Sequence, residues 1–329
     1  HIFVSPGPIY DPVNMDEYIR PVGQALDATG ASGGDVIINT FSYHLVPPGL
    51  GLNEAMQRRG ATVIPTGIGN TDLQVQIMRE LKATGFVGTP SFLAALIKRA
   101  EEQGFNFRQD FSLRFALLGA EMLPPSLRDS FEKDYGINIT QVYATADLGL
   151  LGYECDQKSG MHVPDNMIIE ILDPVTGKQV EPHEIGEVVV TNFSQTYPLI
   201  RFGTGDLSLY TDEPCPCGRT SRRLVRLVGR VGDAVKERGM FLHPGQLREA
   251  ISCYSQVARF QALVNRIQNR DELILKVELA SEEMGGVELP QNLVKSVQEL
   301  CRVRPDKVEF INKGVITGDK FIVDQRTWE

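Results

Sequence analysis

Two glycine-flanked charged residues are the strongest candidates for chemistry in this sequence. The stretch Tyr197-Pro-Leu-Ile-Arg-Phe-Gly-Thr-Gly-Asp206 ends on a carboxylate, and Val228-Gly-Arg230 carries a guanidinium in a second glycine-containing segment. A short carboxylate on a rigid glycine turn can accept hydrogen bonds from two neighbouring hydroxyl groups, such as those of a ribose. The segment after Arg230 contains further glycines, as expected where a chain leads into a mobile domain. The spacing therefore indicates a ribose-binding site at Asp206 and Arg230.

Three cysteines and one histidine form a second candidate site. They come in two clusters, Cys155 with His162 and Cys215 with Cys217, beside turns of a β-rich region. Three thiols and an imidazole are a ligand set typical of tetrahedral structural zinc. The Cys-x-Cys spacing is tighter than the usual two-residue gap, and the alternative is buried thiols with a surface histidine. The remaining cysteines, 253 and 301, fall on predicted helices and are expected in the core.

The elements that carry these residues change in character along the chain. Up to residue 147, short apolar strands alternate with capped helices, which predicts right-handed βαβ units and a mostly parallel sheet. Residues 148–230 have the pattern of antiparallel strands joined by tight turns, and predict a small β-barrel or folded sheet. Residues 231–329 predict a smaller, mobile α+β lid domain. The predicted fold is therefore α/β, with a core at 1–230 followed by this C-terminal domain.

Individual elements can be assigned within the first of these regions. Strands are expected at 35–41, 61–65, 86–87, 113–118 and 137–143, and helices at 50–59, 71–82, 91–103 and 124–134. In the C-terminal region, segments 258–265 and 272–279 predict a hairpin, and 290–301 predicts a helix.

Composition excludes several classes of protein. The 329 residues are 42% hydrophobic with a net charge of −9 and without a Lys/Arg run, which argues against nucleic acid as a partner. No apolar run is long enough to span a membrane, and the first residues lack the pattern of a signal peptide. Five cysteines form no secreted disulfide framework, so the cytoplasm is the expected location. The sequence leaves a homodimer open as the oligomeric state.

The motifs resemble those of the adenylate-forming (acyl-CoA synthetase) superfamily and, within it, the phenylacetate-CoA ligase branch. There the first motif is P-L-I-R-[YF]-x-T-G-D and the second G-R-x-D-D-x(4)-R-G-x(4)-P, which correspond here to 198–206 and 229–244. The resemblance implies an ATP-dependent carboxylate-CoA ligase that acts through an acyl-adenylate, on an aryl or arylacetic acid such as phenylacetate. ATP, Mg, CoA and a small carboxylic acid would be its cofactors and partners. Some relatives also carry E-C-x(6)-H with C-P-C-G-R, as this chain does at 154–162 and 215–219, which favours zinc.

The resemblance also assigns residues to the adenine and the metal. The G-[GA]-E turn, whose backbone passes along the adenine in the family, matches 119–121, and the Y-G-x-[ST]-E motif matches 143–147. Asp147, one methylene shorter than the family Glu, would hold Mg, and Ala146 replaces a hydroxyl residue. Tyr143 would stack on the adenine. The residues carried over for the nucleotide are Gly119, Ala120, Glu121, Tyr143, Ala144, Asp206 and Arg230.

Catalytic, pocket and hinge residues follow from the same resemblance. Lys320 corresponds to the family Lys near the C-terminus, with one residue inserted after Gly318, and would act with Arg230 on the phosphates. An aromatic wall for the acyl group is implied at Phe41, Tyr43 and His44. The lid would rotate about Gly232 and Asp233, and Gly239 would line the pantetheine path.

The first twelve residues depart from the family's phosphate-binding loop. Pro6 and Pro8 lack backbone N–H donors, and Asp11 stands near the position of the family Lys. A degenerate phosphate loop and a truncated or separately encoded N-terminus are therefore expected. Three alternatives stay open: an adenylating enzyme with a non-CoA acceptor, a catalytically impaired nucleotide-binding homologue, and a zinc-stabilised interaction module.

Overall fold

The computed structural model describes most of the chain as two compact units, His1–Val231 and Gly232–Trp328. The described residues are 1–5, 9–174, 176–231, 235–237, 240–242, 244–268, 270–281, 288–301, 303–318 and 320–326. The division falls one residue after the boundary expected at 230. Each unit has its own hydrophobic core.

The first unit opens with a hairpin and a long helix. Strand β1 (Ile2–Ser5) pairs antiparallel with β2 (Ile9–Pro12). Helix α1 (Met15–Thr29) begins where the Asn14 side chain accepts a hydrogen bond from the Asp16 amide, and ends at Gly30 with φ 77°. This helix was not predicted from the sequence.

Parallel strands and helices form the next part, which confirms the predicted βαβ core. The strands are β3 (Val36–Asn39), β4 (Thr62–Pro65), β5 (Gly85–Gly88), β6 (Phe115–Leu118) and β7 (Asn138–Thr145). The helices are α2 (Pro47–Arg58), α3 (Thr71–Glu80), α4 (Pro90–Glu102), α5 (Phe107–Asp110), α6 (Pro125–Asp129) and a π-helical turn, η1 (Ser130–Asp134).

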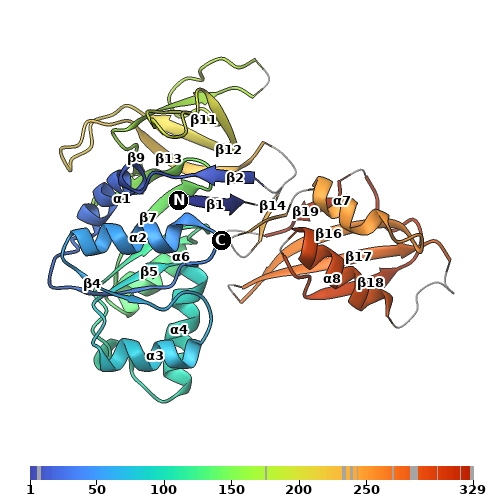
Figure 1. Cartoon of the computed structure of the whole chain (residues 1–329), viewed down its shortest axis with the longest axis horizontal. Helices are drawn as coiled ribbons and strands as arrows, with labels where there is room; N and C mark the ends of the chain where they lie inside the picture. The colour runs from blue at the N-terminus through green and yellow to red at the C-terminus, as the bar shows by residue number, and fades with distance from the viewer. Residues whose placement is uncertain are drawn as a thin grey trace. The chain divides into compact units, whose positions relative to one another are not determined.

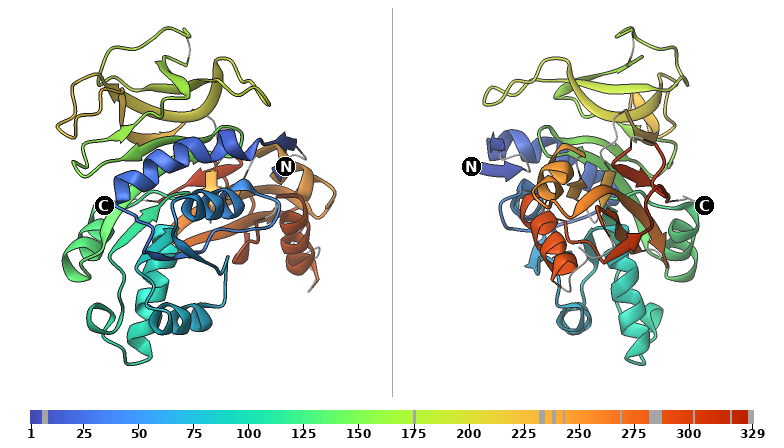
Figure 2. Two further views of the ribbon diagram at one scale, coloured as in Figure 1. Left: turned by 60° about the vertical axis from the view of Figure 1, so that its left-hand side comes forward. Right: turned by 90° about the vertical axis from the view of Figure 1, so that its right-hand side faces the viewer.

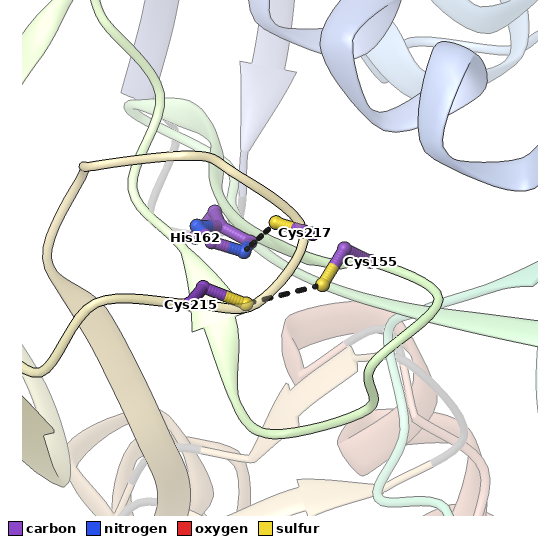
Figure 3. Close-up of side chains that lie close together, drawn as sticks. All are labelled: Cys155, His162, Cys215 and Cys217. Atoms are coloured by element: carbon purple, nitrogen blue, oxygen red, sulfur yellow. Dashed lines mark hydrogen bonds between the residues drawn. The ribbon is translucent and has the colours of Figure 1, made fainter.

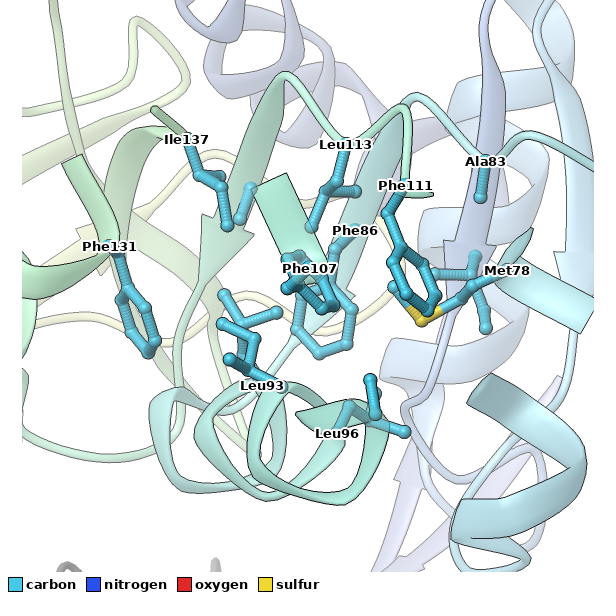
Figure 4. Packing of buried hydrophobic residues seen from close by; sticks show 14 of the residues in the cluster. Met78, Ala83, Phe86, Leu93, Leu96, Phe107, Phe111, Leu113, Phe131 and Ile137 are labelled. Carbon is cyan, nitrogen blue, oxygen red and sulfur yellow. The ribbon is translucent and has the colours of Figure 1, made fainter. Parts of the chain in front are cut away.

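The side chains of these strands alternate between two faces of the sheet, and both faces are buried. Ile38, Phe86 and Leu118 belong to one buried cluster with residues of α3 and α4, and Figure 4 shows Phe86 beside Leu93 of α4. The residues next to them, Ile37 and Val87, belong to a second cluster under α1 and α2, and these two helices lie side by side in both views (Figure 1, Figure 2). Because side chains alternate across a strand, each short apolar run can cover both faces.

Antiparallel strands extend the same sheet. They are β8 (Gly149–Glu154), β9 (Met161–His162), β10 (Met167–Leu172), β11 (Gly186–Asn192), β12 (Phe202–Thr211) and β13 (Arg223–Arg230). The sheet has 11 strands in the order β10-β11-β12-β13-β9-β8-β7-β6-β5-β3-β4. The expected small β-barrel is thus the antiparallel half of one mixed sheet, because β7 pairs parallel with β6 and antiparallel with β8.

The second unit is α+β, as predicted. Its main sheet has the order β18-β17-β16-β19 and consists of β16 (Val257–Ile267), β17 (Arg270–Leu279), β18 (Lys307–Ile311) and β19 (Ile322–Asp324). The predicted hairpin is present, with longer strands than expected. Helices α7 (Pro244–Ser252) and α8 (Leu289–Cys301) pack on it, and β14 (Val235–Glu237) pairs with β15 (Met240–Leu242). Among the described residues, no helix has the length and apolar character needed to cross a membrane.

Candidate nucleotide and metal sites

Asp206 lies on an irregular segment of β12. Glu187 of β11 is opposite Leu207, whereas Val189 is opposite Gly203, so three residues of β12 are accommodated where β11 has one. Gly205, in the middle of this bulge, has φ 72°, a conformation in which glycine carries no steric penalty. The bulge changes the direction of the strand at the position of Asp206, as bulges beside functional sites commonly do.

Both carboxylate oxygens of Asp206 are held by neighbouring side chains. The Tyr143 hydroxyl donates to Oδ2 at 2.7 Å, and Arg230 Nε lies 3.0 Å from Oδ1. Arg230 is the cross-strand partner of Asp206 on β13. Burial, and then the charge of Asp206, raises the pKa of Tyr143 well above its usual value, so its hydroxyl stays protonated and can donate. The structure therefore brings together three residues that the sequence analysis selected separately.

The Tyr143 ring is almost fully enclosed. The residue is 5% exposed and packs with Leu151 and Met161 in the core of the antiparallel half. Ala144, the next residue of β7, is exposed. Tyr143 thus contributes a hydroxyl to Asp206, and stacking of its ring on adenine stays a prediction.

The 119–121 turn follows β6 at the carboxyl edge of the parallel strands. Ala120 has φ 69°, which is unusual for a residue with a Cβ and common at functional turns. The Glu121 carboxylate accepts hydrogen bonds from the Ser91 amide at 3.2 Å and the Ser91 hydroxyl at 2.9 Å, at the first turn of α4. Glu121 therefore anchors the turn to a helix start. Contact between the turn and adenine stays a prediction.

The predicted acyl-pocket residues follow β3. Tyr43 accepts a hydrogen bond from Asn39 Nδ2 at 2.9 Å and donates to Asn53 Oδ1 at 3.3 Å. Burial raises the pKa of Tyr43 to about 12. Phe41 is half-buried, whereas His44 is exposed. Two hydrogen bonds therefore hold the Tyr43 hydroxyl in place, and contact of its ring with an acyl group stays a prediction.

Asp147 lies in the turn after β7, near a second carboxylate. It is half-buried, and its pKa is raised first by burial and then by the negative charge of Asp11. Asp11 is 3% exposed, and its Oδ1 atom has no hydrogen-bond partner among the described residues. A buried carboxylate oxygen without a partner is costly, so Asp11 Oδ1 is a candidate ligand atom for a cation.

The remaining assigned residues lie in the second unit or outside the described part. Lys320 is exposed, and its backbone oxygen accepts a hydrogen bond from Gln261 Nε2 at 2.9 Å in the approach to β19. The expected hinge residues Gly232 and Asp233, the loop residue Gly239, and the prolines Pro6 and Pro8 lie outside the described residues.

Cys155, His162, Cys215 and Cys217 converge on one point (Figure 3). Their ligand atoms all lie within 4.8 Å of one another, although Cys155 follows β8, His162 belongs to β9, and Cys215 and Cys217 lie in the loop between β12 and β13. The Cys155 and Cys215 sulfurs are 3.7 Å apart, and Cys217 Sγ is 3.4 Å from His162 Nε2. A tetrahedral zinc with Zn–S bonds of about 2.3 Å has an S–S edge of about 3.8 Å. The cluster thus has the size of a tetrahedral zinc site.

The protonation and orientation of His162 also suit a ligand. Its Nδ1 atom lies 3.2 Å from the Ser221 hydroxyl, which leaves Nε2 facing Cys217. Burial, followed by the charges of Arg219 and Arg223, lowers the pKa of His162 to about 4. A neutral imidazole is the form that binds a metal.

Sequence reasoning missed the residues that shape the Asp206 bulge. Thr204 Oγ1 donates to the Val188 oxygen at 2.9 Å and accepts from the Asp206 amide at 3.1 Å. Glu187 Oε1 accepts from the Gly205 amide at 3.1 Å. Thr204 belongs to the matched motif, but no sequence signal distinguishes Glu187 from a solvent-facing residue of a strand.

Comparison with known proteins identifies the family. Residues 15–196, more than half of the chain, match the AMP-binding enzyme family. This chain is an AMP-binding enzyme. It is 29% identical over 304 residues to a phenylacetate-coenzyme A ligase from Thermus thermophilus, covering 90% of this enzyme and 68% of that relative. The same-named ligase of Pseudomonas putida is 31% identical over 279 residues, covering 83% of this enzyme and 63% of the relative.

Solved structures show the same fold as this AMP-binding enzyme. A 2-hydroxyisobutyryl-CoA ligase in complex with 2-HIB-AMP and CoA matches with a TM-score of 0.91 and 25% identity, covering 99% of this enzyme and 74% of that chain. A malonyl-CoA ligase with methylmalonyl-CoA and AMP bound matches with a TM-score of 0.70, 17% identity and coverage of 94% and 70%. The second likeness supports the fold alone.

Proposed function

We propose that this AMP-binding enzyme activates a carboxylic acid with ATP and passes the acyl group to the thiol of CoA. The observation that carries the proposal is Asp206, whose two oxygens are aligned by Tyr143 and Arg230 on a rigid bulge, an arrangement suited to two ribose hydroxyls. The curated relatives named as phenylacetate-coenzyme A ligases support the reaction type. Because the chain spans 68% and 63% of their lengths, the activity of the whole protein is part of the proposal.

In the first step, the acid would attack the α-phosphate of ATP to give an acyl-adenylate and pyrophosphate. Arg230 and Lys320 would neutralise the charge that develops on the phosphates. In the second step, the CoA thiol would displace AMP and form the thioester. The proposed acid is aryl or arylacetic, such as phenylacetate, because Phe41 and the clamped ring of Tyr43 would provide an aromatic wall.

The reaction is tested by product formation with a panel of carboxylic acids. We expect pyrophosphate release with arylacetic acids in the absence of CoA, and AMP with acyl-CoA when CoA is added. Pyrophosphate release without formation of the CoA thioester would favour an acceptor other than CoA. AMP binding with no release for any acid would identify an impaired homologue, an alternative favoured by Ala146 and by Asp11 at the expected Lys position.

We further propose that Asp147, together with Asp11, holds the Mg ion that accompanies ATP. The buried, unpartnered Oδ1 of Asp11 and the raised pKa of Asp147 support a cation between these carboxylates. Oxygen ligands are those that Mg prefers, and the ion would supply positive charge beside the phosphates.

Replacing Asp147 or Asp11 with asparagine is expected to weaken Mn²⁺ binding to the nucleotide-free protein by about tenfold or more, because each change removes a negative ligand charge. Mn²⁺ electron paramagnetic resonance measures this directly. Asp16→Asn is the matched control, since the Asp16 side chain is 74% exposed and pairs with Arg58. Unchanged Mn²⁺ affinity in Asp11→Asn would exclude Asp11 as a ligand of the ion.

The Cys155, His162, Cys215 and Cys217 cluster is proposed to hold a structural zinc. Its support is the match between the observed spacing and a tetrahedral site. All four ligands would be protein side chains, as in closed structural sites, so no catalytic role is assigned to this metal. A cytoplasmic location and a homodimer are part of the proposal and are tested by fractionation and by light scattering.

A further inference from the structure

The backbone polar groups of the bulge that carries Asp206 form hydrogen bonds with side chains and with neighbouring strands. Arg230 Nη2 donates to the Thr204 oxygen at 3.0 Å, and the Val231 amide donates to the Gly205 oxygen at 2.7 Å. The Asp206 amide donates to Thr204 Oγ1 at 3.1 Å. The Gly205 amide, which the bulge takes out of the ladder, donates to the carboxylate of Glu187.

Glu187 reaches the bulge from β11, directly opposite Leu207. A carboxylate that accepts a backbone N–H makes a charge-assisted hydrogen bond, which is stronger than a neutral one. The absence of a side chain at Gly203 leaves space for the Glu187 carboxylate, because a Cβ added there would lie 2.7 Å from Glu187 Oε1. Two independent features, the hydrogen bond and the space left by Gly203, therefore fit the Glu187 side chain to this segment.

Glycine by itself does not fix the backbone at position 205. It populates positive and negative φ about equally, so the peptide needs an external restraint to stay in one conformation. Glu187 provides a restraint on the Gly205 N–H, one residue before Asp206. A rotation of that peptide would displace the Asp206 carboxylate from Tyr143.

We propose that Glu187 is a positioning residue, which orients Asp206 for the nucleotide by holding the Gly205 peptide. The inference rests on the proposed nucleotide role of Asp206. Glu187 need not touch the ligand, since its effect passes through the backbone.

The test compares AMP affinity, measured by calorimetry, in Glu187→Ala and Glu187→Gln. Alanine removes the acceptor and is expected to weaken AMP binding about tenfold, whereas glutamine keeps an Oε1 acceptor and is expected to stay within about threefold. In turnover assays with an acid that the enzyme uses, Glu187→Ala should raise KM for ATP more than KM for the acid. A purely structural role would lower the melting temperature without this selectivity.

Glu184→Ala is the matched control, because Glu184 is exposed and its Oε2 also accepts one backbone N–H, from Glu181, at 3.1 Å. Gly203→Ala tests the same contact with Glu187 retained, and should also weaken AMP binding. Unchanged AMP affinity in both Glu187→Ala and Gly203→Ala, with affinity lost in Asp206→Ala, would overturn the Glu187 inference alone. Absence of AMP binding by the unaltered chain would overturn the nucleotide site and this inference with it.

Discussion

Asp206→Ala is expected to weaken AMP binding by at least about tenfold, because the ribose would lose an ionised, oriented acceptor, and hydrogen bonds to charged groups contribute about 1.5–3 kcal/mol. Tyr143 and Arg230 would also lose their shared partner. Isothermal titration calorimetry with AMP measures the effect without requiring catalysis.

The neighbouring Asp212 offers a matched control for this substitution. It also pairs with an arginine, because Asp212 and Arg222 lie just beyond the paired ends of β12 and β13, with Arg222 Nε at 2.9 Å from Oδ1. Asp212→Ala should therefore remove a similar ion pair and leave AMP affinity unchanged. Equal affinity of Asp206→Ala and the unaltered protein would refute the ribose assignment.

Cys155→Ser is expected to reduce bound zinc from about one equivalent to about none, and to destabilise the first unit. Loss of a buried ligand removes binding energy that is available only to the folded state, so we expect at least about 3 kcal/mol, or a fall in Tm of about 6–12 °C. Metal analysis by mass spectrometry and a thermal melt of the same sample measure both effects. The Cys155 thiol is 1% exposed, which makes the loss a core change as well.

Cys253→Ser serves as the control for the zinc experiment. The prediction that Cys253 lies in the core is wrong, because α7 ends at Ser252 and Cys253 is exposed. Its replacement should change neither zinc content nor Tm. Freshly purified, unaltered protein without stoichiometric zinc would rule out the metal, and a lower Tm in Cys155→Ser would then reflect packing alone.

Local patterns were sufficient for much of the fold. Apolar runs and capping residues predicted α3 and α4 to within two residues at each end, because those signals lie inside the elements themselves. Helix α1 escaped prediction. It contains Pro21, which usually ends a helix, yet the residue is buried in the middle of this one.

The candidate sites contain contacts that sequence patterns do not predict. Motifs selected Tyr143, Asp206 and Arg230, and the fold brings their side chains together. Glu187 could not be selected, since its contact with Gly205 depends on the register shift between β11 and β12. Glu121 was selected for its motif, but its capping of α4 depends on the end of β6 lying beside the start of that helix. Such contacts are set by the relative placement of elements, which periodicity does not encode.

The hydrogen bond between Tyr143 and Asp206 has a consequence for the shape of the sheet. Three strands, β13, β9 and β8, separate β12 from β7 in the sheet order, so a flat sheet would place the two strands about 19 Å apart. The Tyr143 hydroxyl and the Asp206 carboxylate nevertheless meet at 2.7 Å, which requires the antiparallel half to curve strongly enough for β12 and β7 to face each other. Strand β9, with two residues, is the shortest strand of this curved half. Asp206 thus lies where β12 and β7 face each other, and the apolar packing between these strands sets the distance between Asp206 and Tyr143.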